Sequence, residues 1–106
     1  MRSSEETAEM RKRGKIDSNH SEIVQALRQI GATVQSLASV GNGCPDLLVG
    51  FRGINVLLEI KSGRRYGFTD AETKWNNAWR GLCCVACTKE QAIAHVVEIT
   101  ESVIGP

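Results

Sequence analysis

The strongest constraint on the fold is a pair of apolar stretches, residues 47–51 and 54–61, separated by the dipeptide Arg52-Gly53. Two β-type stretches joined by two residues, one of them Gly, are typical of a β-hairpin. A two-residue turn also fixes the register of the two strands, because a slip of one residue would send every side chain to the opposite face. In this register Asp46 lies directly opposite Glu59, so the sequence predicts two carboxylates as cross-strand neighbours.

Like charges that face each other across a hairpin destabilise it, and a divalent cation between Asp46 and Glu59 would compensate. Glu59 stands in a nearly continuous apolar stretch, which is typical of a strand inside a sheet covered on both faces, and a carboxylate buried there needs a partner. Lys61 shares a face with Glu59, since side chains alternate along a strand. The alternative interpretation is an ordinary turn Asp and a solvated Glu-x-Lys edge with a weak ion pair.

Composition sets the limits for the rest of the chain. With 106 residues, 42% of them apolar, we expect one soluble globular domain. We expect no association with a membrane, because no run approaches the ~18 apolar residues of a membrane span. Glu5, Glu6 and Glu9 precede any apolar stretch, which argues against a signal peptide and favours a cytoplasmic protein.

The net charge of +1 does not by itself indicate nucleic acid, but the basic residues are clustered. One cluster comprises residues 11–13 and Lys15, which we interpret as a solvated tail. The other comprises Lys61, Arg64 and Arg65 beside the carboxylates, where contact with phosphate and simple solvation remain alternatives.

Cysteine spacing gives a weaker indication of a metal or redox site. Cys83, Cys84 and Cys87 lie in an apolar run, where reduced cysteine acts as a small hydrophobic residue. Cys84 and Cys87 have C-x-x-C spacing, but the chain has no second such pair, and its two histidines, His20 and His95, lie far apart in sequence. A zinc or redox protein stays a minor alternative.

The remaining patterns predict the element order α-β-β-β-α-β-α, an α/β fold with a mixed sheet flanked by helices. Residues 1–18 are expected to be a polar arm, frayed or disordered, before a single domain over 19–106. Capping boxes at Thr69–Glu72 and Thr88–Gln91 predict two helix starts. The crossover helix should make the third and fourth strands parallel. The expected bounds are a helix over 19–30, strands over 33–38, 47–51, 54–61 and 82–87, a helix from 69 to 81, and a helix from 88 to about 97.

Two tryptophans, Trp75 and Trp79, lie one turn apart on the crossover helix. We expect them in the core or on a dimer face rather than on nucleic acid.

Three motifs follow one another along the chain: residues 43–48, residues 58–63, and residues 68–72 with Trp79. They resemble the restriction-endonuclease-like superfamily of PD-(D/E)xK nucleases, and more narrowly its VRR-NUC family of virus-type replication and repair nucleases. The likeness covers about residues 19–97, and small stand-alone members of the family occur in phages. A phage origin would place the chain in the host cytoplasm. The chain departs from the family in having Glu72 where Gln is common. The motifs are Gly43-Cys44-Pro45-Asp46-Leu47-Leu48, Leu58-Glu59-Ile60-Lys61-Ser62-Gly63, and Phe68-Thr69-Asp70-Ala71-Glu72 with Trp79.

The resemblance implies a Mg²⁺- or Mn²⁺-dependent DNA endonuclease that acts as a homodimer on branched DNA such as Holliday junctions. Asp46 and Glu59 would bind the metal with the main-chain carbonyl of Ile60, and the resemblance adds Glu22 on the first helix as a further ligand. Lys61 would orient the attacking water and stabilise charge on the phosphate.

Accessory roles are assigned with the same resemblance in view. Gln25 is a candidate for positioning a water, and Glu72 is a candidate accessory residue whose capping role already explains it. Arg64, Arg65 and Lys61 are expected to contact phosphates. Tyr66 or Phe68 could anchor a loop or stack on an unpaired base. The alternatives are a non-catalytic DNA-binding module on the same fold and a nonspecific nicking or flap nuclease.

Overall fold

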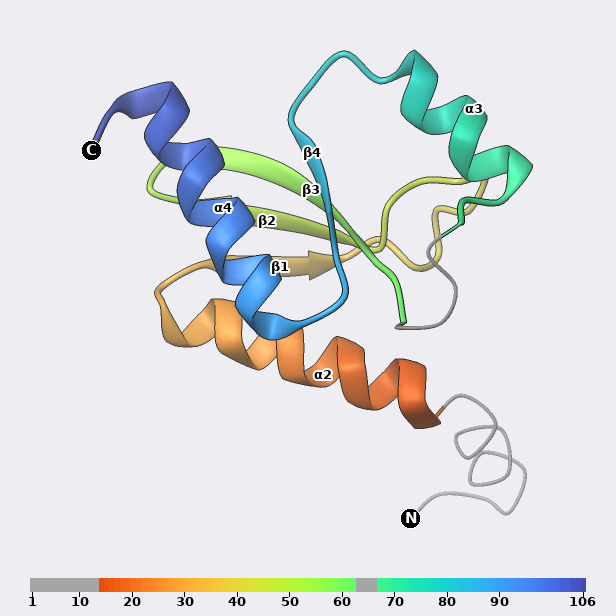
Figure 1. Cartoon of the computed structure of the whole chain (residues 1–106), viewed down its shortest axis with the longest axis horizontal. Helices are drawn as coiled ribbons and strands as arrows, with labels where there is room; N and C mark the ends of the chain where they lie inside the picture. Colours follow the sequence, from red (N-terminus) through yellow and green to blue (C-terminus); the bar gives the residue numbers. More distant parts are fainter. Residues whose placement is uncertain (1–13, 63–66) are drawn as a thin grey trace.

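The structure is a computed structural model that describes residues 14–62 and 67–106, with side chains from Asn19 onward outside that gap. Its element order matches the order expected from the sequence, and the fold is a mixed α/β fold (Figure 1). The elements are α2 (Gly14–Gln29), β1 (Thr33–Ser36), β2 (Leu47–Phe51), β3 (Ile54–Ile60), α3 (Asp70–Ala78), β4 (Cys83–Ala86) and α4 (Lys89–Ile104).

The strands form one sheet in the order β1-β2-β3-β4. β2 pairs with both β1 and β3 in antiparallel fashion, whereas β4 runs parallel to β3, as the crossover through α3 predicted. The hairpin has the predicted register, with Phe51 opposite Ile54. Arg52 and Gly53 both have positive φ angles, 51° and 85°, which is the geometry of a type I′ turn. The prediction for the hairpin is therefore confirmed.

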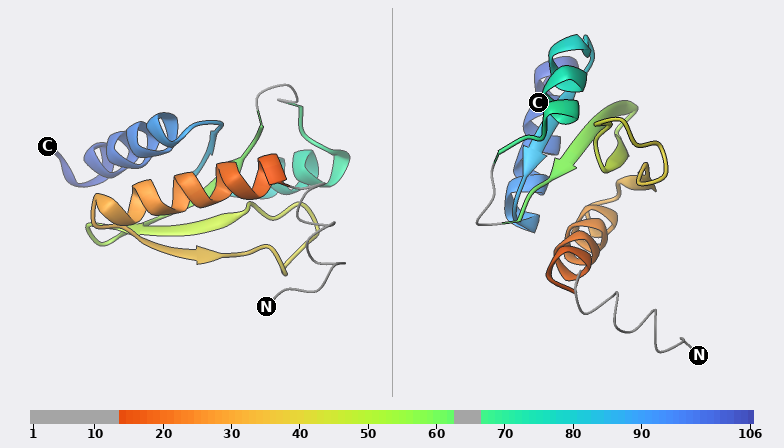
Figure 2. Two further views of the ribbon diagram at one scale, coloured as in Figure 1. Left: turned by 90° about the horizontal axis from the view of Figure 1, so that it is seen from below. Right: turned by 90° about the vertical axis from the view of Figure 1, so that its right-hand side faces the viewer.

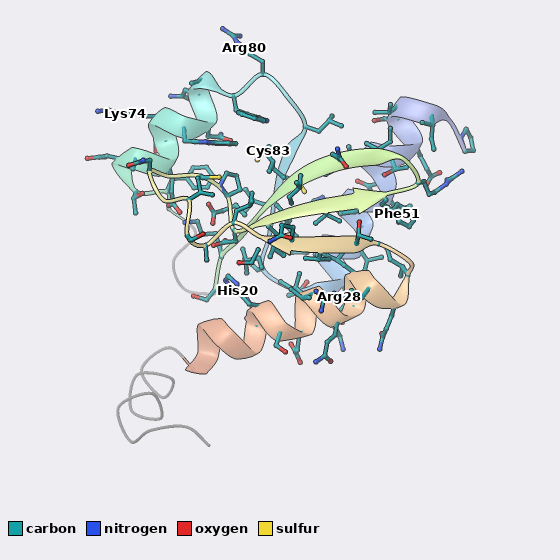
Figure 3. All side chains as sticks on the ribbon, turned by 180° about the vertical axis from the view of Figure 1, so that it is seen from behind. His20, Arg28, Phe51, Lys74, Arg80 and Cys83 are labelled. Carbon is teal, nitrogen blue, oxygen red and sulfur yellow. The ribbon has the colours of Figure 1, made fainter. Side chains whose placement is uncertain are left out.

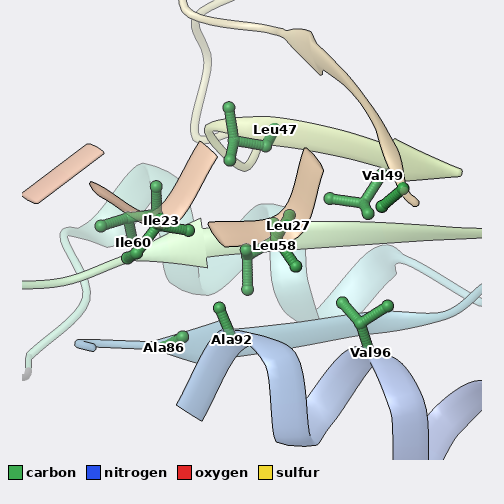
Figure 4. Packing of buried hydrophobic residues seen from close by; sticks show 10 residues of the cluster. Ile23, Leu27, Leu47, Val49, Leu58, Ile60, Ala86, Ala92 and Val96 are labelled. Atoms are coloured by element: carbon green, nitrogen blue, oxygen red, sulfur yellow. The ribbon is translucent and has the colours of Figure 1, made fainter. Parts of the chain in front are cut away.

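Helices α2 and α4 lie side by side on one face of the sheet (Figure 2). The core between these helices and the strands is apolar and is shown in Figure 4. Its buried residues come from both helices and from the inner positions of the strands: Ile23, Leu27, Ala32, Leu47, Val49, Leu58, Ile60, Ala86, Ala92 and Val96.

The expectation that helices cover both faces of the sheet is wrong in part. On the other face, α3 lies only at one end, where its Trp75 lines a small cavity with Cys83 and Val85. Leu48, on the open part of that face, remains partly exposed. The apolar sequence of β3 nevertheless reflects real burial, because every residue from Val56 to Ile60 is buried.

Three helix bounds differ from the prediction by more than one residue. One of them is the end of α3, which lies at Ala78 rather than at 81. α2 begins at Gly14 rather than Asn19, so residues 14–18 belong to a helix, and only 1–13 of the expected arm fall outside the described residues. A capping pattern is only a preference. A helix can extend past it toward the N-terminus when the preceding residues, here 15–18, include no Pro or Gly. α4 likewise continues past Val97 to Ile104 and ends at Gly105, whose φ of 86° stops a helix. In the part of the chain that the structure describes, no helix has the length and apolar character needed to cross a membrane.

The two tryptophans do not lie in the core, so this alternative for them is wrong. Every residue of α3 is at least partly exposed, and 47% of Trp79 is accessible to solvent. The indole rings of Trp75 and Trp79 stack on each other, with centroids 4.7 Å apart and planes 16° from parallel. The two rings cover part of each other, and Trp75 also lines the small cavity. These contacts take the place of burial against the sheet.

Candidate active site

A cavity of about 330 Å³ opens where three elements meet: the end of β3, the first half of α2 and the start of α3. Figure 3 shows His20 projecting from α2 toward this end of the sheet. The cavity is lined mainly by polar and ionisable side chains: Asn19, His20, Asp46, Glu59, Ile60, Lys61, Ser62, Gly67, Thr69 and Glu72.

Asp46 enters the cavity just before β2 begins. Its main-chain carbonyl accepts a 2.8 Å hydrogen bond from the N–H of Leu37. Its Oδ2 accepts a 2.7 Å hydrogen bond from the main-chain N–H of Ile60. The N–H and C=O of one strand residue point to the same side, so the carbonyl of Ile60 also faces the side where Asp46 lies. The side chain of Asp46 is thus tied to the strand that carries Glu59.

Glu59 is the one acidic side chain buried in the described residues, with 6% of its surface exposed. Its pKa is raised from 4.5 to about 9 by burial first, then by a hydrogen bond with Asp46 and by the charges of Asp46 and Glu72. The charge of Lys61 works in the opposite direction but is outweighed. Without an added cation, burial and the adjacent Asp46 carboxylate therefore favour the protonated form of Glu59.

Lys61 turns its ammonium toward α3. Its Nζ lies 2.7 Å from Oε1 of Glu72 and 5.2 Å from the centre of the Phe68 ring. The pKa of Glu72 is lowered: burial alone would raise it, but hydrogen bonds from Lys61 and from the main-chain N–H of Thr69 outweigh that effect. Lys61 and Glu72 are therefore a charged pair at neutral pH.

The loop before Asp46 packs directly on α3. Gly43 has a φ of 81°, and a β-carbon there would lie 2.2 Å from the carbonyl oxygen of Ala71 and 2.7 Å from the nitrogen of Glu72. Only glycine allows the two backbones to approach this closely. This contact sets the distance between the loop that carries Asp46 and the helix that carries Glu72.

The structure brings together five of the residues expected in the site: Asp46, Glu59, Ile60, Lys61 and Glu72. The pairing of the two carboxylates agrees with the hairpin register. Glu72 also forms the predicted capping box with Thr69.

Two other expected residues, Glu22 and Gln25, are exposed on α2, and neither is among the described residues that line the cavity. Their expected roles receive no support from this geometry and stay predictions. Arg64, Arg65 and Tyr66 fall outside the described residues, as does the basic cluster at 11–13.

Sequence reasoning missed Asn19 and His20, which are the residues that α2 contributes to the cavity. Asn19 Nδ2 lies 3.5 Å from the carbonyl oxygen of Lys61, a long contact across the site. A signal was available, because Asn19 precedes the buried Ile23 by four residues and so shares its face of the helix.

The donor set fits a hard cation. Mg²⁺ commonly takes one or two carboxylates from a protein and completes its coordination with water and substrate oxygens. Asp46, Glu59 and the Ile60 carbonyl supply such a partial set. Among the described residues there is no group of three or more His, Cys, Asp or Glu side chains arranged to hold a metal ion.

The cysteines form no alternative centre in the described residues. Cys44, Cys83, Cys84 and Cys87 are free and partly buried. Burial first, then the charges of Glu59 and Asp46, raises the pKa of the Cys44 thiol, and burial raises the pKa of Cys84 to about 12. The raised pKa values make Cys44 and Cys84 protonated, weakly reactive thiols.

In comparisons with known proteins, no protein-family profile, no curated protein and no solved structure matches the chain.

Proposed function

We propose that the protein is a Mg²⁺- or Mn²⁺-dependent DNA endonuclease with a restriction-endonuclease-like core. One observation carries the proposal: Asp46 and Glu59 adjoin in an open cavity, and Lys61, the lysine that lines it among the described residues, is paired with Glu72. Two adjacent carboxylates, one of them buried, are expected where a cation binds. A locally unfavourable arrangement of this kind is typical of a functional site.

The residues of the chain would have distinct roles. Asp46, Glu59 and the carbonyl of Ile60 would hold the ion. When bound, Mg²⁺ or Mn²⁺ polarises the phosphate and lowers the pKa of a bound water. Lys61 reaches the cavity from the same strand as Glu59 and would donate hydrogen bonds to a non-bridging phosphate oxygen, where charge grows in the transition state.

Branched DNA is the proposed substrate, and the protein is proposed to act as a homodimer. The family resemblance supports both points. Paired cuts across a symmetric junction require two copies of the site formed by Asp46 and Glu59, which a homodimer would supply. Three exposed apolar side chains, Phe68, Trp79 and Leu82, offer a surface for self-association.

The test is cleavage of labelled linear, flap and four-way DNA in the presence of Mg²⁺, Mn²⁺ or Ca²⁺. We expect cutting of the four-way substrate with Mg²⁺ or Mn²⁺, no cutting with Ca²⁺, and loss of cutting in Asp46→Asn and Glu59→Ala. Glu98→Gln, which removes an exposed carboxylate on α4, is the matched control and should cut like the wild type. Equal cutting of all three DNA forms would favour a nonspecific nicking or flap nuclease.

The second candidate is a DNA-binding module that no longer cuts. It would bind four-way DNA without cleavage under every metal condition, and Asp46→Asn would leave its affinity unchanged. The presence of Asp46, Glu59 and Lys61 around one cavity favours the enzyme.

A further inference from the structure

We infer that Glu72 is a positioning residue that holds the Lys61 ammonium at one place in the cavity, so that α3 as well as β3 sets where positive charge meets a substrate phosphate. This inference rests on the proposed nuclease function. It assigns to Glu72 a task beyond capping its helix.

Two hydrogen bonds with Thr69 hold Glu72 in place independently of Lys61. Its Oε1 accepts a 2.8 Å hydrogen bond from the main-chain N–H of Thr69, and its own N–H donates to Thr69 Oγ1 at 3.2 Å. The same Oε1 accepts the 2.7 Å bond from Lys61 Nζ. One oxygen thus serves both the cap and the ammonium, which makes the cap a fixed anchor for Lys61.

The pair is shielded from solvent. The side chains of Lys61 and Glu72 are 12% and 19% exposed, so water competes weakly for the bond. The Phe68 ring lies 5.2 Å from the ammonium and restricts it from a second side. A free lysine side chain would sample many rotamers, and holding it in one removes an entropy loss from the transition state.

The helix that presents Glu72 is itself placed by the loop that carries Asp46. The close approach of Gly43 to the backbone of Ala71 and Glu72 allows little relative movement. Because of this contact, the distance between Asp46, the proposed metal ligand, and the carboxylate of Glu72 stays fixed. Glu72 therefore has a role in the cavity in addition to capping α3.

Four single variants and one double variant separate positioning from capping. Glu72→Ala removes the carboxylate that accepts from the Thr69 N–H and from Lys61 but keeps the main-chain N–H that donates to Thr69 Oγ1. Glu72→Gln keeps an oxygen that can accept from both donors. Thr88→Ala removes the N-cap side chain of α4, whose Oγ1 accepts a hydrogen bond from the N–H of Gln91. It is the matched control because Thr88 is not among the described residues that line the cavity. Lys61→Met, alone and combined with Glu72→Ala, completes a double-mutant cycle.

We expect Glu72→Ala to lower kcat on four-way DNA at least about tenfold with little change in KM, since a hydrogen bond to a charged group is worth about that much. Glu72→Gln should recover most of the rate, Thr88→Ala should stay within about threefold of wild type, and Glu72→Ala should cause no further loss in the Lys61→Met background. If Glu72→Ala matches Thr88→Ala, or still lowers the rate without Lys61, the inference is overturned.

A measurement independent of cleavage separates this inference from the nuclease proposal. In ¹⁵N-labelled protein, a held ammonium exchanges slowly enough to give its own NMR signal. We expect the Lys61 signal in wild type, Glu72→Gln and Thr88→Ala, and its loss in Glu72→Ala. If the wild type does not cut but the signal follows this pattern, the nuclease proposal fails and the placement of Lys61 stands. If the signal is absent from wild type or survives Glu72→Ala, the inference fails whatever the activity.

Discussion

Asp46 Oδ2 accepts a 2.7 Å hydrogen bond from the main-chain N–H of Ile60, the residue that follows Glu59. This bond ties the loop before β2 to the end of β3 and keeps two carboxylates adjacent, although their charges repel. The resulting strain is relieved in the metal-free protein by a proton on Glu59 and, in our account, by a divalent cation in the working enzyme.

Replacing Glu59 by Gln should stabilise the metal-free protein at alkaline pH. Folding raises the pKa of Glu59 from 4.5 to about 9, so its favourable contribution is complete below pH 4.5 and is lost as the pH rises toward 9. The neutral amide of the variant has no such dependence on pH. One pKa unit corresponds to about 1.4 kcal/mol, so we expect Glu59→Gln to gain at least about 1 kcal/mol in free energy of unfolding near pH 8 and nothing near pH 4.

Urea unfolding without divalent ions, at both pH values, measures this difference. Glu98→Gln is the control and should show no comparable pH-dependent gain, because Glu98 is exposed. A Glu59→Gln variant less stable than wild type near pH 8 would show that Glu59 is ionised and already compensated.

Cation binding should strengthen as the pH rises. The ion must displace the proton of Glu59, whose pKa is about 9, so affinity for Mn²⁺ should increase by up to about tenfold per pH unit between pH 6.5 and 8.5. Calorimetric titrations in two buffers of different ionisation enthalpy would also detect the released proton. Affinity that is constant over this range, with no proton released, would contradict the shared-proton state of Asp46 and Glu59.

Gly43→Ala should disrupt the site far more than Gly41→Ala. Both glycines have positive φ, 81° and 73°, so each substitution carries a similar backbone strain of about 1 kcal/mol. At Gly41 a β-carbon meets nothing within 4 Å, whereas at Gly43 it meets the α3 backbone at 2.2 Å. We expect Gly43→Ala to lose at least about 2 kcal/mol more stability than Gly41→Ala. Thermal unfolding and cleavage rates compare the two, and equal losses would mean that the loop is not seated on α3.

Truncating an exposed indole should matter less than truncating a smaller core side chain. Leu58 is fully buried, and we expect Leu58→Ala to lower the free energy of unfolding by about 2–5 kcal/mol. Trp79, which is 47% exposed, should lose less than about 2 kcal/mol on substitution by Ala, mostly from its stacking on Trp75. A larger loss at Trp79 than at Leu58, in protein dilute enough to be monomeric, would contradict the solvent exposure of Trp79.

Local sequence signals predicted much of this fold. The turn dipeptide Arg52-Gly53 determined the hairpin register, and from it the proximity of Asp46 and Glu59 followed by counting residues. The cap formed by Thr69 and Glu72 was likewise visible as a short motif. Such features depend on residues close in sequence, where spacing alone determines geometry.

Features that depend on distant segments could not be predicted in this way. The bond between Lys61 and Glu72, the contact of Gly43 with Ala71, and the entry of His20 into the cavity each depend on how a helix docks at the end of the sheet. The exposure of Trp79 was missed for the same reason, because an aromatic pair at helical spacing indicates a core face until the position of its helix is known.

Binding of Mn²⁺ to the purified, metal-free protein tests the central claim most directly, because it depends on no choice of DNA substrate. Titration calorimetry at about pH 8 should show one or two ions bound to wild type and to Glu98→Gln, and no measurable binding to Asp46→Asn or Glu59→Gln. Wild-type protein that binds no Mn²⁺, or an Asp46→Asn variant that binds it equally well, would show that these two carboxylates are not a cation site.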